Sequence, residues 1–199
     1  QAGKIGEVKT CWINMSQDFP KYRPDFQKTY YAKKSMGGGA ILDGASHMID
    51  LLQWTMGDIT EVCAMYDRLV LQGVEAEDTA VISLRFKSGA MAQITMNQFQ
   101  KPNASTIDFA GTKGNLKLEF SKLEFADNDS GEWATQDFMA GLAPMEVHEA
   151  RFALQANLFL DAVEGKPCPL TTLEEARANL RVALAAKESY DSKRIIALG

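Results

Sequence analysis

An aspartate and a histidine four residues apart, Asp43 and His47, are the pair in this sequence best suited to acid–base chemistry. Side chains at this spacing lie one turn apart on the same face of an α-helix. A carboxylate beside an imidazole favours the charged ring, and the other ring nitrogen can take a proton from a substrate hydroxyl. The same spacing is common on ordinary exposed helices, where Asp43 would simply suit the dipole at a helix N-terminus. On spacing alone a catalytic pair and a structural pair are both open, and the structural pair is the commoner.

Residues 37–57 predict the helix that carries this pair. Three glycines open the stretch and Gly57 closes it, as expected of a residue that adopts the left-handed conformation easily. Between them apolar residues recur at helical spacing, which predicts one buried stripe. The stripe consists of Ile41, Ala45, Met48, Ile49, Leu52 and Met56.

The composition is that of a soluble globular protein, with 46% hydrophobic and 24% charged residues in a chain of 199. A net charge of -5 and the lack of a Lys/Arg cluster argue against nucleic-acid binding. The sequence shows no apolar run of membrane-spanning length and no signal-peptide pattern. The three cysteines, Cys11, Cys63 and Cys168, are widely separated, which favours reduced thiols in a cytoplasmic protein over a disulfide frame or a zinc site.

Neither a Gly-x-Gly-x-x-Gly fingerprint nor a P-loop occurs in the sequence, so we expect no nucleotide cofactor to bind this chain alone. The first residues lead at once into a predicted strand, Glu7 to Met15, as in the middle of a longer protein. A loop of residues 16–36 follows, which its prolines keep irregular. Its aromatic side chains favour packing and ligand contact equally: Phe19, Tyr22, Phe26, Tyr30 and Tyr31.

Residues 59–127 predict an antiparallel sheet, because alternating strands are joined by turns as short as Lys87-Ser88-Gly89. Gln93, Thr95 and Asn97 form a polar row on one face of this strand. Three interpretations are open: the row faces solvent, lines a ligand site or contacts another subunit. Exposure to solvent is the commonest of the three. We expect strands at 59–71, 78–86, 90–99, 105–110, 116–120 and 123–126.

A polar, glycine-rich loop at 127–144 precedes two predicted helices. The first spans 146–165, and His148 near its start is expected to be a surface residue. The second begins at Thr172, where Glu175 completes a capping box. Together these elements predict an α+β domain, a large, mostly antiparallel open sheet with helices packed on one face.

The glycine run with its acid–base pair, Gly37-Gly-Gly-Ala-Ile-Leu-Asp43 followed by His47, resembles the Gfo/Idh/MocA oxidoreductases. The opening Ile5-Gly6-Glu7-Val8, the Gly111-Thr-Lys-Gly114 turn and the closing pair of helices also match that family. The resemblance extends over the whole chain, but only over the family's C-terminal domain, whose fold is like that of the C-terminal domain of glyceraldehyde-3-phosphate dehydrogenase. It implies that residues 1–199 are a substrate-binding and oligomerisation domain, whose N-terminal Rossmann partner domain is absent from this chain.

The function implied by this resemblance is that of an NAD(P)-dependent dehydrogenase acting on a hydroxyl of a sugar, cyclitol or related polyol. His47 would take the hydroxyl proton as hydride leaves the carbon, and Asp43 would orient the imidazole. NAD or NADP would bind the full-length protein through its own Rossmann domain. The expected substrate contacts are Arg23, Tyr31, Lys33 and Asn97.

Two other functions are compatible with the residues. A non-catalytic binding or dimerisation module with a vestigial Asp/His pair would use the exposed sheet face. A metal hydrolase is disfavoured, because two ligands at helical spacing are too few and the sequence has one other histidine. Since a wide sheet with helices on one side leaves its other face uncovered, we expect a homo-oligomer through that face, with no nucleic-acid or membrane partner.

Overall fold

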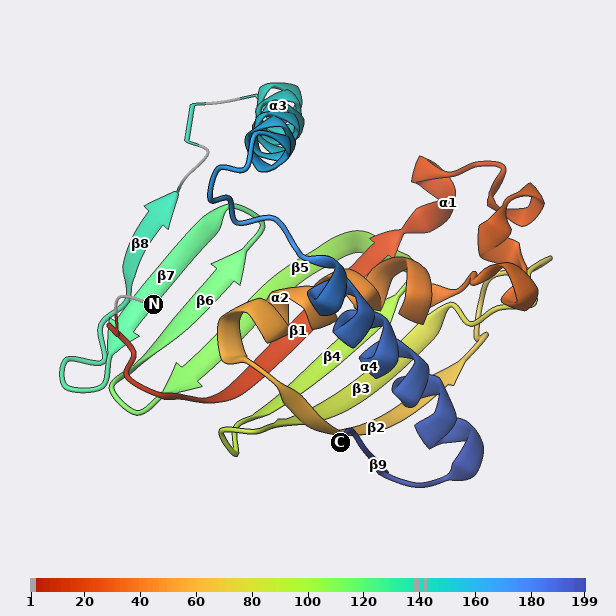
Figure 1. The fold of residues 1–199 in the computed structure, drawn as a ribbon, viewed down its shortest axis with the longest axis horizontal. Coiled ribbons are helices and arrows are strands. Elements are labelled where there is room, and N and C mark those ends of the chain that lie inside the picture. The colour runs from red at the N-terminus through yellow and green to blue at the C-terminus, as the bar shows by residue number, and fades with distance from the viewer. Residues whose placement is uncertain (1–2, 138–139, 142) are drawn as a thin grey trace.

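The computed structural model describes residues 3–137, 140–141 and 143–199. Within these residues the chain forms one sheet of nine strands, in the order β8-β7-β6-β5-β1-β4-β3-β2-β9 (Figure 1). The predicted open, mostly antiparallel sheet is confirmed. The strands are β1 Val8–Asp18, β2 Ile59–Asp67, β3 Thr79–Phe86, β4 Met91–Asn97, β5 Phe99–Gly111, β6 Gly114–Glu119, β7 Lys122–Asp127, β8 Ala134–Asp137 and β9 Ile196–Ala197.

One neighbouring pair of strands, β1 and β4, is parallel, whereas the other pairs of the described sheet are antiparallel. Parallel strands require a long crossover connection. Here the crossover runs over the sheet as helix α2, Ser46–Met56, before the chain returns through β2 and β3. The crossover therefore places α2, and with it His47, above the central strands.

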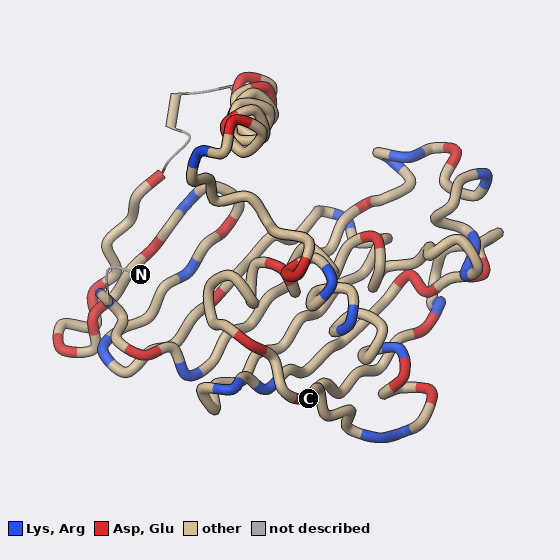
Figure 2. The backbone as a smooth tube through the Cα atoms, viewed as in Figure 1, with Lys and Arg blue, Asp and Glu red and all other residues tan. Residues whose placement is uncertain are grey.

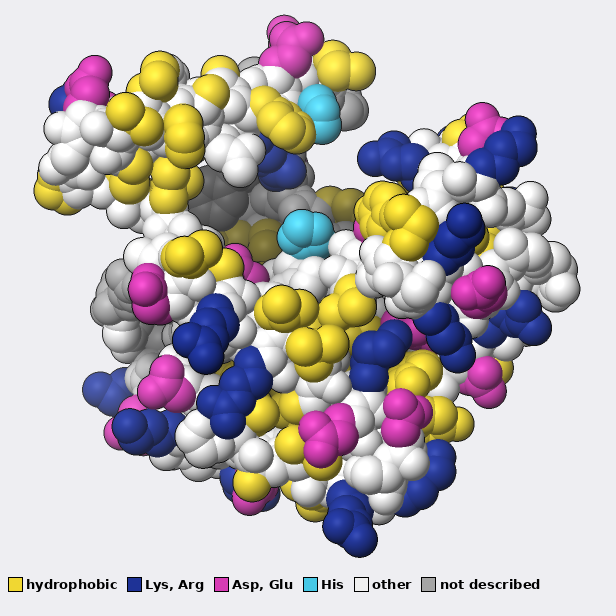
Figure 3. Space-filling model, turned by 45° about the vertical axis from the view of Figure 1, so that its right-hand side comes forward, with side chains coloured by type: hydrophobic (Ala, Val, Ile, Leu, Met, Phe, Trp, Pro, Cys, Tyr) yellow, Lys and Arg dark blue, Asp and Glu magenta, His cyan; other side chains and the backbone are white. Residues whose placement is uncertain are grey.

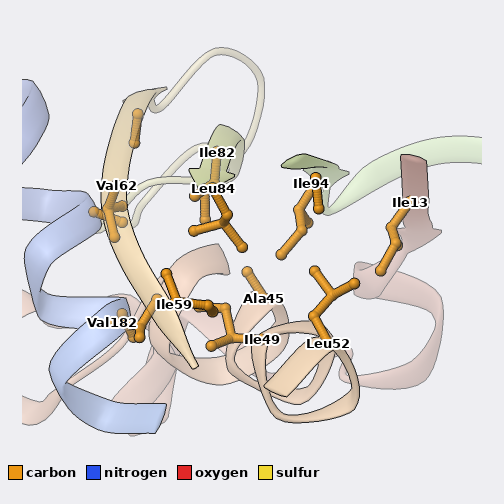
Figure 4. Close-up of a cluster of buried hydrophobic side chains, with 14 of the residues drawn as sticks. Ile13, Ala45, Ile49, Leu52, Ile59, Val62, Ile82, Leu84, Ile94 and Val182 are labelled. Carbon is orange, nitrogen blue, oxygen red and sulfur yellow. The ribbon is translucent and has the colours of Figure 1, made fainter. Parts of the chain in front are cut away.

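Helices α2 and α4, Leu173–Ser192, cover the same face of the central strands (Figure 1). Figure 4 shows Ala45, Ile49 and Leu52 pointing toward the sheet residues Leu84 and Ile94. Burial of apolar surface contributes about 25 cal/mol per Å² to stability. The apolar contact between α2 and the sheet therefore holds this helix in place. Four members of the stripe predicted for the helix are fully buried: Ile41, Ala45, Ile49 and Leu52.

Strand alternation divides the sheet into a covered face and an open face. The residues between the buried ones point away from the helices, and on that side Trp12, Met65 and Met91 are 48%, 65% and 47% exposed. The described chain therefore leaves an apolar sheet face uncovered. On β3 the buried residues are those that the alternation predicts: Ala80, Ile82, Leu84 and Phe86.

The segment predicted as an irregular loop at 16–36 contains helical turns, so that prediction is corrected. Pro20 lies in the first turn of a helix, where proline is tolerated, and so does not break it. The turns are α1 Phe19–Tyr22 and the 3-10 turns Phe26–Lys28, Tyr30–Ala32 and Lys34–Met36. A second small core holds them together: Phe19, Phe26, Tyr31, Ala32, Leu71 and Val74. We call residues 19–36 the aromatic lobe.

Two strands lie where the sequence predicts none, namely β8 within the 127–144 loop and β9 near the end of the chain. β8 is exposed along its whole length, so no apolar alternation marks it, and β9 has two residues. Both form through backbone pairing with a neighbouring strand, which the local sequence does not encode. Residues 138, 139 and 142 of the predicted loop lie outside the described residues.

The two C-terminal helices differ in how they are packed. Helix α4 begins at the predicted cap, where the Thr172 hydroxyl accepts from the Glu175 amide at 3.2 Å and the Glu175 carboxylate accepts from the Thr172 amide at 2.7 Å. Helix α3, Pro144–Val163, stands away from the sheet (Figure 1). Six of its large apolar side chains are 58–70% exposed: Met145, Phe152, Leu154, Phe159, Leu160 and Val163.

The surface chemistry follows the composition. Acidic and basic residues are interspersed along the described backbone (Figure 2). None of the helices in the described ranges is long and apolar enough to cross a membrane. Cys11, Cys63 and Cys168 are free thiols, as their spacing predicts.

Candidate active site

The predicted helix over residues 37–57 begins with a π-helical turn, Ile41–Ala45, and becomes α-helical at Ser46. A π-turn closes its hydrogen bonds five residues apart, so residues spaced by four across it do not stack as they do in an α-helix. Single π-turns inside helices occur frequently at functional sites. Asp43 lies within this turn and His47 lies in the first turn of α2, so the pair spans the change in helix type.

The carboxylate of Asp43 accepts a hydrogen bond from the hydroxyl of Tyr30 in the aromatic lobe. Among the described residues this phenol, and not His47, is the partner of the carboxylate. The hydrogen bond to Asp43 raises the pKa of Tyr30, because the bond stabilises the protonated phenol beside a negative charge. Tyr30 is 50% exposed, and it is not among the four substrate contacts that the resemblance implies.

His47 is exposed on the outer side of α2. Its imidazole forms no hydrogen bond or ion pair with any residue that the structure describes, which leaves both ring nitrogens available to an external group. Within residues 3–137, 140–141 and 143–199, no group of three or more His, Cys, Asp or Glu side chains could hold a metal ion. Because the His47 imidazole is exposed and both its nitrogens are open, it is suited to proton transfer.

The prediction that Tyr31 contacts substrate is corrected, because its side chain is buried in the small core of the aromatic lobe. The residue is 1% exposed, and its ring lies 4.3 Å from the ring of Phe19, centre to centre. Burial raises the pKa of Tyr31. Neighbouring residues of a 3-10 turn point in different directions, so Tyr31 turns inward while Tyr30 turns toward Asp43.

The other three predicted substrate contacts lie in two places. Arg23 and Lys33 are exposed on the aromatic lobe, as is Tyr30, and the Arg23 guanidinium donates to the Tyr22 carbonyl at 3.0 Å. Asn97 lies on the open face of the sheet, since its neighbour Met96 packs beneath the helices. The sheet thus separates Asn97 from His47, and the prediction for Asn97 is corrected. Its amide nitrogen donates to Ser16 at 3.1 Å and to Gln100 at 3.2 Å.

The glycine run at the start of the site is required by close backbone packing. A Cβ on Gly38 would lie 2.1 Å from the carbonyl oxygen of Tyr31. Gly39 has a φ of +105°, and a Cβ there would lie 2.5 Å from the carboxylate of Glu77. Side chains are therefore excluded at both positions, and the run brings the turn against the aromatic lobe and against the segment that precedes β3.

Comparison with known proteins identifies the family. A model of the GFO/IDH/MocA C-terminal domain matches residues 1–117. The chain belongs to the Gfo/Idh/MocA family. It is 27% identical over 173 residues to the myo-inositol 2-dehydrogenase of Thermotoga maritima, which covers 82% of this chain and 50% of that protein. It is 28% identical over 134 residues to an uncharacterized oxidoreductase of Synechocystis, which covers 61% of this chain and 35% of that protein.

Solved structures of this Gfo/Idh/MocA fold align with nearly the whole chain. Levoglucosan dehydrogenase in complex with NADH and L-sorbose superposes with a TM-score of 0.82 at 20% identity, covering 99% of this chain and 60% of that one. The WlbA dehydrogenase of Bordetella pertussis, in complex with NADH and UDP-GlcNAcA, superposes with a TM-score of 0.77 at 24% identity, covering 99% and 58%. The chain spans half or less of the curated relatives it matches, and the structural likeness establishes the fold of the family's C-terminal domain.

Proposed function

We propose that this chain is the substrate-binding and proton-handling domain of an NAD(P)-dependent dehydrogenase that acts on a hydroxyl of a sugar, cyclitol or related polyol. The observation that carries the proposal is the exposed imidazole of His47, four residues after Asp43 on a π-to-α helix in a domain of an oxidoreductase family. Support for the substrate class comes from relatives whose names include myo-inositol and levoglucosan.

In the proposed reaction, His47 accepts the proton of the substrate hydroxyl. Asp43, four residues earlier in the same helix, would favour the imidazolium that forms. The phenol of Tyr30 donates its one proton to the Asp43 carboxylate and so fixes that carboxylate. The phenol is half exposed, and its oxygen can accept a hydrogen bond from a substrate hydroxyl once the substrate is bound. A nicotinamide cofactor, when bound, supplies the hydride acceptor. Arg23 and Lys33 offer charged donors on the same lobe for the remaining hydroxyls of a polyol.

Residues 1–199 would form the C-terminal domain, and the full-length protein's own Rossmann domain would bind NAD or NADP. The helix-bearing side of this chain leaves apolar surface open to such a partner. A groove of about 890 Å³ lies between residues 3–9 and the outer strands, lined by Phe109, Leu116 and Phe125. Figure 3 shows the exposed hydrophobic side chains of α3 and a hollow beneath that helix. These uncovered surfaces support a second domain packed on the same side as His47.

The test is a spectrophotometric assay of the full-length protein with NAD or NADP and a panel of cyclitols, anhydrosugars and sugars. We expect reduction of the nicotinamide with at least one polyol. The matched control is the 199-residue chain, which we expect to show no NAD(P) binding by calorimetry because it has no phosphate-binding glycine loop. Micromolar binding of NAD(P) by the control would contradict the proposal that the cofactor binds the Rossmann domain and the substrate binds this one.

The same protein is proposed to assemble through the open face of the sheet. That face carries a shallow groove of about 420 Å³ and exposed apolar side chains, among them Trp12, Met65 and Met91. Two such faces packed against each other would bury more than about 1,000 Å² in total, the size expected of a specific interface. A non-catalytic dimerisation module, the alternative function, would use the same face.

Substitution of Met65 and Met91 by glutamate together should shift the full-length protein to monomers, because two carboxylates on each face would be buried without partners. Light scattering at several protein concentrations measures the change in mass. Lys87→Glu in the exposed β3–β4 turn is the control, since it alters charge away from the sheet face. A wild-type protein that is strictly monomeric at high concentration would show that this face is not an interface.

A further inference from the structure

A buried carboxylate reaches the start of the site helix from a distant part of the chain. Glu77 lies just before β3, and its side chain is 1% exposed. We propose that Glu77 is a positioning residue, which holds the π-turn of the site in place and thereby sets the location of Asp43 and His47. This inference rests on the proposed function, because it assigns Glu77 a task in the same site.

The contacts of Glu77 converge on two consecutive backbone amides. Its carbonyl oxygen accepts from the Ala40 amide at 2.8 Å, and its Oε1 accepts from the Ile41 amide at 3.2 Å. The first amides of a helix have no partner within the helix. Glu77, 36 positions after Ile41 in the chain, thus supplies the N-terminal cap that no neighbouring side chain provides for this helix. Its negative charge at the helix N-terminus also suits the helix dipole.

The opposite oxygen of the carboxylate joins the site to α4. Glu77 Oε2 accepts from the Lys187 ammonium at 2.9 Å, and that side chain is 21% exposed. The ammonium also lies 5.1 Å from the ring centre of Tyr66. One carboxylate therefore links the last helix of the chain, the segment before β3 and the first residue of the π-turn.

The absence of a side chain at Gly39 makes room for the Glu77 carboxylate. Any side chain there would collide with the carboxylate, and its φ of +105° is one that residues with a side chain rarely adopt. Part of the glycine run that the sequence marks as a site motif therefore serves to admit the Glu77 carboxylate against the backbone.

Stability alone does not explain a charge in this place. Removing a carboxylate and an ammonium from water costs much of what their attraction returns, and well-packed apolar residues of similar volume are often as stable or more so. An apolar side chain, however, offers no acceptor for the Ile41 amide. The distinctive contribution of Glu77 is therefore the oxygen at the helix start.

Loss of the hydrogen bond between Glu77 and the Ile41 amide would displace Asp43, which follows Ile41 by two residues. The Asp43 amide donates to the Gly39 carbonyl at 3.0 Å, so the glycine, the aspartate and the turn move together. The Tyr30 hydroxyl is bonded to the Asp43 carboxylate, and a displaced turn would also break that bond. A shift of about 1 Å at reacting groups can cost roughly 100-fold in rate.

Two uncharged double variants of the full-length protein separate the acceptor from the charge. Glu77→Gln/Lys187→Met keeps an oxygen for the Ile41 amide, whereas Glu77→Leu/Lys187→Met removes it, and both lose the ion pair. We expect kcat within about threefold of wild type in the glutamine variant and a loss of roughly 10- to 100-fold in the leucine variant. KM for the polyol and affinity for NAD(P) should change little in either. Glu77→Asp, one methylene shorter with the charge kept, should also lose kcat and serves if the leucine variant does not fold.

Hydrogen exchange followed by mass spectrometry gives a second readout that does not need activity. The peptide covering residues 38–48 should exchange faster in the leucine variant than in the glutamine variant, with peptides of β3 and β4 unchanged. Equal kcat and equal exchange in the two variants would overturn the inference, as would a loss of protection throughout the sheet, which marks a purely structural role. If the wild-type protein shows no dehydrogenase activity, the proposed function fails, and the exchange comparison still decides whether Glu77 holds the turn.

Discussion

Replacement of His47 by alanine in the full-length protein should lower kcat by roughly 10²–10⁴-fold, the usual contribution of a positioned general base. The imidazole is exposed and has no partner among the described residues, so its removal should cost little stability. Affinity for NAD(P) should barely change, because the proposed cofactor site lies in the other domain. Steady-state kinetics over a range of pH, with NAD(P) binding measured separately, provides the test.

The second histidine supplies the matched control for this experiment. His148 is exposed on α3, 4.7 Å from the ring of Phe152, and His148→Ala should leave turnover unchanged. Near-normal turnover of His47→Ala across the pH range would show that Asp43 and His47 have no catalytic role and are ordinary residues of an exposed helix face.

Asp43→Asn tests whether the carboxylate works together with the imidazole. It should slow the reaction, because the amide no longer favours the imidazolium. The double variant with His47→Ala should be little worse than His47→Ala alone, since residues that act as one unit are not additive. Tyr30→Phe removes the observed partner of Asp43 and should have a smaller effect of the same kind.

Replacement of Asp78 by alanine should lower the free energy of unfolding by roughly 2–5 kcal/mol, because a buried donor left without its partner costs about 1–3 kcal/mol and a partly buried donor, which water can reach, costs less. Asp78 is fully buried next to Glu77. Its carboxylate accepts from the amides of Leu69, Val70 and Leu71 at 2.9, 2.8 and 2.7 Å. It also accepts from the Thr79 hydroxyl at 2.9 Å. No single water or neighbouring side chain replaces four such bonds, so the turn that follows β2 should loosen.

Urea denaturation of the 199-residue chain, followed by circular dichroism, measures this loss. Asp129→Ala, at an exposed carboxylate of a surface turn, is the control and should change stability by less than about 0.5 kcal/mol. Similar midpoints for the two variants would mean that the amides of residues 69–71 find other partners, and that Asp78 does not organise the segment that carries Glu77.

The sequence by itself determined the elements whose signals are local. The period of two on β3 and β4, the helical stripe of residues 41–56 and the Thr172/Glu175 capping box each depend on residues close together in the chain. These patterns sufficed for the fold class, and the glycine run with Asp43 and His47 sufficed for the family. Local chemistry is enough in such cases because neighbours within a few residues satisfy the backbone or share one face.

Only the tertiary structure decided how the site is assembled. The π-turn, the choice of Tyr30 over Tyr31 as the partner of Asp43, and the placement of Asn97 on the far side of the sheet depend on packing between distant segments. The same is true of β8 and β9, which exist through pairing with neighbours, and of Glu77, which caps a helix 36 residues away in sequence. The physical reason is common to all of them: a buried polar group or an unpaired strand edge is satisfied by whatever the fold brings near it, and no short stretch of sequence contains both partners.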